Sequence, residues 1–263
     1  MSVSGCDGLK AQLDCIKTYS AGVTSLFTIR LDCTGGRVYD CTGLALDVTG
    51  KVSLRAGKAC SLFARPSLTV GTNDTSSPAL FKVGGAAHAS LSIRGADMSL
   101  GGGRGGILAD GGGGVALTSV TISGGLGPLV GGARRGGAVY ASNAKVSLSS
   151  TTLTSNAAAL GGALYFEADS GFAPSGLVAP LSISGSKLTG NTADRDGGAL
   201  YATTARTDSK ATVSVRSTTA SENKVGAPGR CSAKAWGPES FPCMRGWLFV
   251  RVALVRLRAL ECY

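Results

Sequence analysis

Three short sequence blocks recur in a fixed order, and they constrain the fold more than any other feature of the chain. The first block pairs two glycines with a following apolar segment, at residues 105–108, 136–140, 161–165 and 197–201. The second alternates apolar and small residues, at 91–93, 115–117, 146–148, 181–183 and 213–215. The third ends on Asn three residues after an apolar or small residue, at 153–156, 188–191 and 220–223. Such recurrence indicates a repeat protein.

The uneven spacing of the blocks favours a β-solenoid over helical repeats. The glycine pairs start 31, 25 and 36 residues apart, and the Asn blocks start 35 and 32 residues apart. A helical repeat holds its length nearly constant, whereas in a parallel β-solenoid only the strands must stack, at about 4.8 Å per coil. Strand-like alternation begins near residue 44. We therefore predict an all-β solenoid of roughly six or seven coils over residues 44–225.

Each block has a predicted place in such a coil. The alternating block predicts inward side chains at Leu117, Val146, Leu148, Ile183 and Val213. Glycine pairs permit left-handed corners and close approach of neighbouring backbones. Asn also tolerates the left-handed conformation, so Asn156, Asn191 and Asn223 are predicted to stack as a ladder along the solenoid.

The composition agrees with this architecture. The 263 residues include 40 glycines, about twice the usual frequency, which excludes a mainly helical protein. The glycines cluster without a period of three, which excludes collagen. Only 16% of the residues are charged, and 26 basic against 16 acidic side chains give a net charge of +10.

The two ends depart from the repeat. Residues 1–43 form a predicted N-terminal cap with a short amphipathic helix over 7–19, in which Asp7 is the N-cap and Leu9, Leu13 and Ile16 share one face. Residues 226–263 form an irregular C-terminal tail that contains both tryptophans. Three interpretations of the tail stay open: a second cap, an extension from an incorrect gene model, and a helix on a membrane surface.

The cysteines bear on the compartment. Five lie early, at 6, 15, 33, 41 and 60, and three lie late, at 231, 243 and 262. None has zinc-type Cys-x-x-Cys spacing. Clustering at the ends favours disulfide-stapled caps, with reduced core cysteines as the alternative, and an odd number in each cluster leaves one thiol unpaired. Cys33 and Cys41 are a predicted pair that closes a small loop.

Two further signals concern secretion. The N-terminus lacks an apolar run of signal-peptide type, so we expect either a cytosolic protein or a chain without its true start. Asn73-Asp74-Thr75 matches the N-glycosylation acceptor, which gives weak support for secretion.

The glycine pairs and the Asn corners together resemble the repeats of the chlamydial polymorphic outer-membrane proteins. They are also similar to the broader right-handed parallel β-helix, or pectin-lyase-like, families. The match covers roughly residues 105–225, and where the family repeat has Phe this chain has Leu153, Leu188 and Ala220. The resemblance implies a right-handed parallel β-helix displayed at a cell surface.

The sequence offers few candidates for chemistry. Cleavage of acidic polysaccharides on such a fold needs converging carboxylates or calcium held by carboxylates. Asp194-Arg195-Asp196 is the one tight acidic group on a repeat corner, and we interpret it as a solvated turn. His88 is interpreted as a packing or surface residue. The run 101–114 lacks the Gly-Lys-Ser/Thr ending of a phosphate loop and is interpreted as a long corner loop. We predict no catalytic, cofactor-binding or metal-binding residues.

These observations lead to a predicted function. We expect a non-catalytic, extracellular or cell-surface β-helix scaffold, adhesin-like, that binds glycans or proteins along its length. The alternatives are a polysaccharide lyase or glycoside hydrolase, complete or truncated, and a fragment without autonomous function. The basic charge suits acidic polysaccharide or surface proteins, or is simply solvated. The sequence shows no nucleic-acid motif and no apolar stretch long enough to be a transmembrane segment, and it does not predict an oligomeric state.

Overall fold

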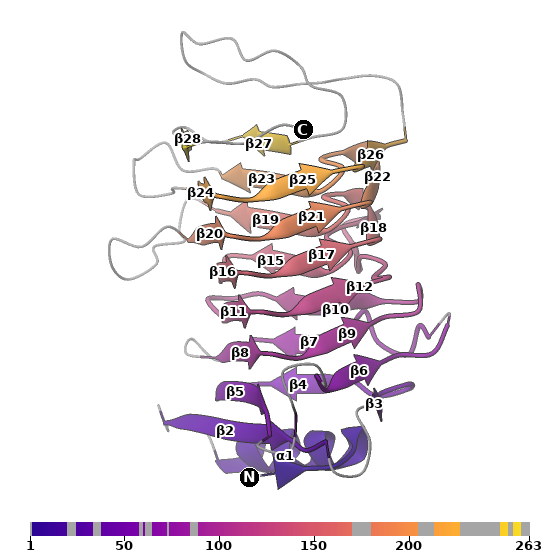
Figure 1. Cartoon of the computed structure of the whole chain (residues 1–263), viewed down its shortest axis with the longest axis vertical. Coiled ribbons are helices and arrows are strands. Elements are labelled where there is room, and N and C mark those ends of the chain that lie inside the picture. Colours follow the sequence, from indigo (N-terminus) through magenta and orange to yellow (C-terminus); the bar gives the residue numbers. More distant parts are fainter. Residues whose placement is uncertain are drawn as a thin grey trace, which may run out of the picture.

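The described part of the chain is mostly β-structure with one helix. The computed structural model describes residues 2–19, 25–33, 38–57, 60, 65–72, 74–84, 89–169, 180–204, 213–226, 248–251 and 255–258. Its strands stack in a tall column that rises from the helix near the N-terminus (Figure 1). Among the described residues, all strand pairs run parallel apart from one hairpin, β13 (Leu129–Val130) with β14 (Ala133–Arg134).

Three long sheets form the walls of the column, and we call them sheets A, B and C. Sheet A contains β1 (Ser2–Val3), β2 (Leu26–Leu31), β5 (Lys51–Ala56), β8 (Ser90–Arg94), β11 (Gly114–Thr118), β16 (Lys145–Ser149), β20 (Leu181–Ser184), β24 (Val213–Arg216) and β28 (Val255–Arg258). Sheet B contains β3 (Val38–Asp40), β6 (Ser67–Thr69), β9 (Asp97–Ser99), β12 (Thr121–Ser123), β17 (Thr152–Thr154), β21 (Lys187–Thr189) and β25 (Thr219–Ser221). Sheet C contains β4 (Leu46–Val48), β7 (Ala79–Val83), β10 (Gly105–Ala109), β15 (Val139–Ser142), β19 (Leu164–Ala168), β23 (Leu200–Thr204) and β27 (Leu248–Arg251).

A short fourth sheet, sheet D, lies at the corner between sheets B and C. It contains β18 (Ala157–Leu160), β22 (Thr192–Asp196) and β26 (Lys224–Val225). The chain visits the long sheets in a repeating cycle, because β5, β6 and β7 lie in A, B and C, and β8 then returns to A beside β5. This path is consistent with a parallel β-solenoid.

The parallel pairing extends past both ends of the predicted solenoid range of 44–225. On the N-terminal side, β2 pairs with β5 and β3 pairs with β6. On the C-terminal side, β27 pairs with β23 and β28 pairs with β24, so two strands lie within the segment expected to be an irregular tail.

The core consists of apolar side chains stacked from coil to coil. In sheet A one inward row aligns Leu91, Val115, Val146, Leu181 and Val213, and all five side chains are buried. The predicted inward residues Leu117, Val146, Leu148, Ile183 and Val213 are each at most 3% exposed, which confirms that prediction. Alternation along each strand therefore separates a continuous apolar interior from a polar exterior.

Glycine pairs shape the corners that lead into sheet C. Gly161 has a φ of +62°, a conformation that side-chain-bearing residues rarely adopt. A Cβ on the next residue, Gly162, would overlap the carbonyl oxygen of Gly198 one coil further along. Gly136 and Gly197 also have positive φ, whereas Gly105 already lies within strand β10. The predicted left-handed corner thus occurs in three of the four pairs, and the predicted close approach also occurs in the fourth, where a Cβ on Gly106 would lie 2.6 Å from the carbonyl oxygen of Ala138.

The predicted Asn ladder is confirmed, but the left-handed conformation expected of the Asn residues belongs to the residue before each of them, at Ser155, Gly190 and Glu222. The side chain of Asn156 donates from Nδ2 to Oδ1 of Asn191 at 3.0 Å, and Asn191 donates likewise to Asn223 at 2.9 Å. Each Asn also donates to a main-chain carbonyl of the preceding coil, at Ile122, Leu153 and Leu188. The ladder therefore ties successive coils at one corner.

Helix α1 (Cys6–Tyr19) covers the N-terminal end of the column, where a helix over 7–19 was predicted (Figure 1). It begins at Cys6, so Asp7 lies in its first turn and the prediction of Asp7 as the N-cap is wrong. Its apolar face, Leu9, Leu13 and Ile16, is buried in the same core as the strands. An end of a solenoid exposes open strand edges and core side chains, and this helix covers them.

Two disulfides join the cap to the first coils, and the predicted Cys33–Cys41 pair is wrong. Cys41 bonds to Cys6 at the start of α1, and Cys33 bonds to Cys60. Cys33 follows β2 and Cys60 follows β5, its neighbour in sheet A, so stacking brings the two thiols together although 27 residues separate them. Cys15 is free and exposed, which agrees with an odd thiol in the early cluster. Cys231, Cys243 and Cys262 lie outside the described residues.

Candidate functional site

The outward face of sheet A is basic. Its described strands contain Lys and Arg but no Asp or Glu. The outward residues form three rows along the column, set by the strand register. The Arg row is Ser2, Arg30, Arg55, Arg94, Thr118, Ser149, Ser184 and Arg216; the Ser row is Thr28, Ser53, Ser92, Ala116, Ser147, Ser182 and Ser214; the Lys row is Leu26, Lys51, Ser90, Gly114 and Lys145. We call the three rows together the basic face.

The cations of the basic face have no acidic partners among the described residues. None of the ion pairs in that part of the chain involves a side chain of the Arg or Lys rows. Arg30, Arg55 and Arg94 lie directly opposite one another on three neighbouring strands, and all three are exposed. Arg55 donates from Nε to Oγ of Ser53 at 3.1 Å, which orients its guanidinium over the sheet. Like charges placed opposite each other destabilise a sheet, so this arrangement costs folding energy.

A shallow hollow of about 410 Å³ interrupts the basic face at β11. Its floor is formed by Gly114 and Ala116, which have little or no outward side chain. Ser92 and Ser147 line it from the two neighbouring strands, and Lys145 stands at its edge. The hollow therefore combines hydroxyl groups, a small flat floor and a cation.

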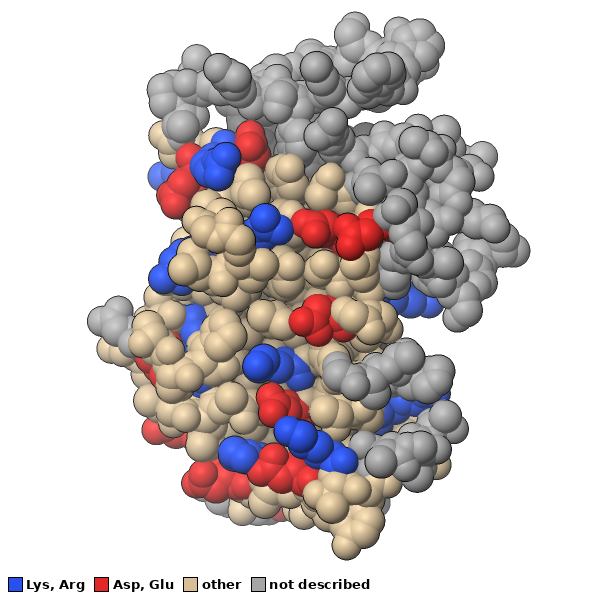
Figure 2. All heavy atoms as spheres, turned by 180° about the vertical axis from the view of Figure 1, so that it is seen from behind, with Lys and Arg blue, Asp and Glu red and all other residues tan. Residues whose placement is uncertain are grey.

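The other two walls have a different chemistry. Sheet B presents mostly Ser and Thr outward, including the continuous row Thr69, Ser99, Ser123, Thr154, Thr189 and Ser221. From behind, on the side where sheet C lies, red and blue residues occur near one another and most of the described surface is uncharged (Figure 2). Among the described strands of the long sheets, a face with basic and no acidic side chains belongs to sheet A.

Sheet C carries a stack of three tyrosines on its outer side. Tyr165 lies between Tyr140 and Tyr201, with ring centroids 5.5 and 5.2 Å apart. Arg135, just after the β13–β14 hairpin, covers the Tyr165 ring and pairs with Glu167 at 3.1 Å. Burial, together with the hydrogen bond that the Tyr165 hydroxyl donates to Glu167, raises the pKa of Tyr165 well above its ordinary value. The hydroxyl stays protonated at neutral pH, and the group anchors the hairpin to the wall.

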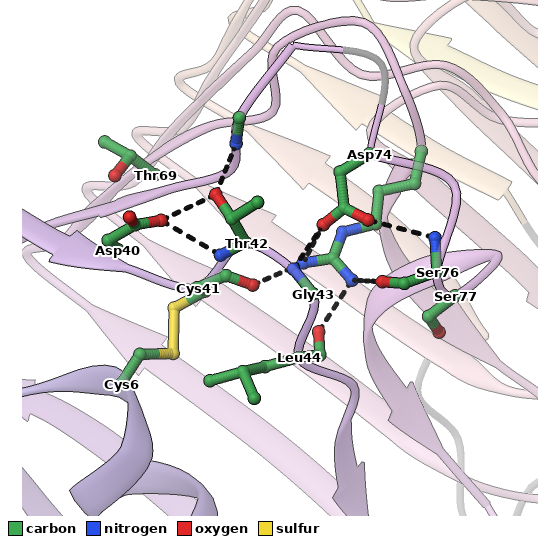
Figure 3. A network of polar contacts seen from close by, with 12 residues as sticks. Cys6, Asp40, Cys41, Thr42, Gly43, Leu44, Thr69, Asp74, Ser76 and Ser77 are labelled. Atoms are coloured by element: carbon green, nitrogen blue, oxygen red, sulfur yellow. Dashed lines mark hydrogen bonds and ion pairs between the residues drawn. A yellow bond between two sulfur atoms is a disulfide. The ribbon is translucent and has the colours of Figure 1, made fainter.

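A buried ion pair joins three coils near the N-terminal end (Figure 3). Arg104 is 1% exposed and lies 3.3 Å from Asp74. Its guanidinium donates to the carbonyl oxygens of Cys41 at 2.8 Å and Leu44 at 2.6 Å. Asp74 accepts hydrogen bonds from the main-chain N–H groups of Gly43 and Ser76. Every charge in this cluster faces protein, so its role is to hold coils together.

That ion pair changes the interpretation of the glycine-rich run 101–114. The run was expected to be one long corner loop, but strand β10 occupies its middle and β11 begins at Gly114. Arg104 lies in the short turn before β10, and its buried side chain pairs with the Asp74 carboxylate and donates to main-chain carbonyls. The two glycine clusters are therefore corners on either side of a strand.

The acidic candidate lies away from the basic face. Asp194 and Arg195 are exposed in β22 of sheet D, and Asp196 is half-buried at the end of that strand, so the interpretation of this group as a solvated turn is wrong. The neighbouring strand β18 offers Ala157, Ala158 and Leu160 in register with β22, so no second carboxylate faces this group from it. Within the described part of the chain, no three His, Cys, Asp or Glu side chains gather closely enough to hold a metal ion. His88 and Asn73 lie outside the described residues.

No protein-family model, no curated protein and no solved structure matches this chain. Over the described residues, no helix has the length and apolar character needed to cross a membrane. The candidate site is therefore defined by its own geometry.

The basic face was not predicted from the sequence. Its signal is short: an Arg follows the second inward apolar residue at Ile29-Arg30, Leu54-Arg55, Ile93-Arg94 and Val215-Arg216. These dipeptides are tens of residues apart, so they look like scattered charge until the register of sheet A aligns them.

Proposed function

We propose that this chain is a right-handed parallel β-helix that acts outside the cell, or at its surface, as a non-catalytic scaffold for acidic polysaccharide. The observation that supports this function most directly is the basic face of sheet A. It is long, flat and lined by cations that the described residues leave unpaired. Such a surface attracts a polyanion along its whole length.

The chemistry of the face favours a glycan over a nucleic acid. Serine and threonine hydroxyls fill the spaces between the cations, and they can donate to and accept from sugar hydroxyls. Proteins that bind single-stranded nucleic acid stack bases on aromatic side chains. The outward rows of sheet A contain no aromatic residue among those described. The two disulfides are typical of oxidising compartments, which favours an extracellular polysaccharide.

The scaffold interpretation also fits the placement of the carboxylates. Glycoside hydrolysis requires two carboxylic groups that flank the bond to be cleaved. The described strands of the basic face carry none, and Asp194 and Asp196 lie on sheet D. The second candidate function, a polysaccharide lyase or hydrolase, therefore depends on Asp194 and Asp196 alone.

Binding to heparin-type and polygalacturonate chains, measured by calorimetry at low and high salt, tests the proposal. We expect a triple variant, Arg30→Ser, Arg55→Ser and Arg94→Ser, to lose at least about tenfold in affinity at low salt. A matched variant, Lys82→Ser, Lys187→Ser and Arg195→Ser, removes the same charge from sheets B, C and D and should bind nearly as the wild type. Equal losses of affinity in the two variants would show that binding depends on the net charge of the protein and not on the basic face.

The second candidate is tested by incubating the wild-type chain with polygalacturonate and calcium. The scaffold function requires that no unsaturated or reducing-end product accumulates. Product that disappears in an Asp194→Ala, Asp196→Ala double variant would overturn the proposal in favour of an enzyme.

A further inference from the structure

Within the basic face, the hollow over β11 has features that the rest of the face lacks. Elsewhere in the three rows a side chain covers the sheet, Ser, Thr, Lys or Arg at every position but Leu26, whereas Gly114 and Ala116 leave the sheet surface open. Leu91 and Val115 also border the hollow, and their side chains are buried, so they contribute main-chain surface. A flat ring could therefore lie directly on the strand here.

Charge surrounds the hollow on opposite sides. Lys145 neighbours Gly114 on β16, in the Lys row, and Arg94 neighbours Thr118 on β8, in the Arg row. Both side chains are exposed and take part in none of the ion pairs between described residues. The two strands flank β11 and the two residues align with positions four residues apart on it, so the cations lie on a diagonal, about 10 Å apart along the column and about 13 Å apart along the strands. A bound group would meet positive charge at both of its ends.

We infer that this hollow is a subsite for one anionic sugar residue of a linear polysaccharide that lies along the column. This inference rests on the proposed function and adds the place on the basic face at which one sugar of the polysaccharide binds. The hydroxyls of Ser90, Ser92, Ser147 and Ser182 surround the ring position and suit its hydroxyl groups. Carboxylate or sulfate groups on the flanking sugars then reach Lys145 and Arg94.

The repeat of the fold suits this orientation. Neighbouring strands are about 4.8 Å apart, which is close to the length of one sugar in an extended chain. A glycan that lies along the column therefore advances by roughly one sugar per coil and meets the Arg row at Arg30, Arg55 and Arg94 in turn. The ligand class is a linear polysaccharide with an acidic group on most of its sugars.

The test fills the hollow without changing charge. Ala116→Leu places a larger side chain on the floor, and Ala133→Leu makes the same change in the β13–β14 hairpin, at a position of similar half-exposure. The probes are a hexamer of galacturonate, a sulfated hexasaccharide and a neutral hexasaccharide. We expect Ala116→Leu to lose at least tenfold in affinity for the acidic hexamers and Ala133→Leu to bind as the wild type, with no measurable binding of the neutral probe.

The remaining outcomes separate the subsite from the proposed function. Unchanged binding by Ala116→Leu, with loss in the triple Arg variant, would overturn the subsite alone, whereas no binding of acidic glycans by the wild type would overturn both. Single-stranded DNA that binds as tightly as the glycans and is weakened equally by Ala116→Leu would reduce the hollow to a general anion contact. Lys145→Gln, at an exposed position, should also weaken binding of the acidic hexamers, and it keeps the subsite testable if Ala116→Leu fails to fold.

Discussion

At the scale of single residues, the Arg104–Asp74 pair shows what a solenoid interior can accommodate. Burial alone would raise the pKa of the Asp74 carboxyl, but hydrogen bonds from the Gly43 and Ser76 N–H groups and the charge of Arg104 outweigh it. The pKa of Asp74 therefore lies below its usual value. A buried ion pair contributes little net stability over an apolar pair, but removing one partner leaves the other charge uncompensated.

Replacing Asp74 tests this reasoning. At pH 7 we expect Asp74→Asn to lower the free energy of unfolding by about 3–5 kcal/mol, because Arg104 then lies buried without a counter-charge. A carboxyl whose folded-state pKa is depressed stabilises the fold above its unfolded-state pKa of about 3.9, and this contribution is lost as the pH falls through the folded-state value. The difference between wild type and variant, measured by urea unfolding, should therefore shrink towards pH 3. The exposed Asp194→Asn serves as the control and should leave the free energy of unfolding at pH 7 nearly unchanged, because Asp194 has no buried counter-charge.

Arg104 also shows where prediction from the sequence stops at this scale. The residue lies in a glycine-rich run and has no apolar neighbours that would indicate burial. Its partners Cys41, Leu44 and Asp74 belong to two earlier coils. Only the stacking of coils creates such contacts, and the same reason explains why the cysteine pairing was predicted incorrectly.

At the scale of elements, short local patterns were sufficient to predict most of the architecture. The alternating blocks predicted strands and their inward side chains, because burial on one face requires that alternation. The Asn blocks predicted the ladder, because each Asn occupies the same corner of its coil. The hairpin β13–β14 was not predicted, since it is an insertion that occurs in one coil and leaves no repeat.

The Asn ladder carries a prediction at this scale. Asn191→Ala would leave the Asn156 main-chain N–H and the Leu153 carbonyl without their partners in a buried corner. We expect a loss of about 1–3 kcal/mol in unfolding free energy for each group left unsatisfied. Asn223→Ala makes the same change at the end of the ladder, where the side chain is half-exposed and water can replace it, so its loss should be clearly smaller. Equal losses of unfolding free energy for the two variants, measured by chemical unfolding, would contradict the argument that burial of Asn191 makes its hydrogen bonds harder to replace.

At the scale of the whole molecule, the repulsion between the cations of the basic face lowers the stability of the fold, and the same cations form the proposed binding surface. Arg55 lies between Arg30 and Arg94 and repels both. We therefore expect Arg55→Ser to leave the unfolding free energy unchanged or to raise it by up to about 1 kcal/mol at low salt, and the gain should vanish at high salt.

The control for this prediction is Lys82→Ser on sheet C. Lys82 lies opposite Asp47, so its loss removes a favourable neighbour rather than a repulsive one. Thermal or urea unfolding of both variants at two salt concentrations provides the comparison. A clear loss of stability in Arg55→Ser at low salt would show that the Arg row is structural, and the case for a binding face would weaken.

The stacked arrangement also determines how the column responds to force. The hydrogen bonds of sheets A, B and C join one coil to the next, so they run along the column and a pull on its ends loads them one coil at a time. The two disulfides lie at the end covered by α1, where they fasten the helix and the first coils covalently. Under tension along the column we therefore expect the coils next to the two disulfides to separate last, after described coils that only hydrogen bonds and packing hold together.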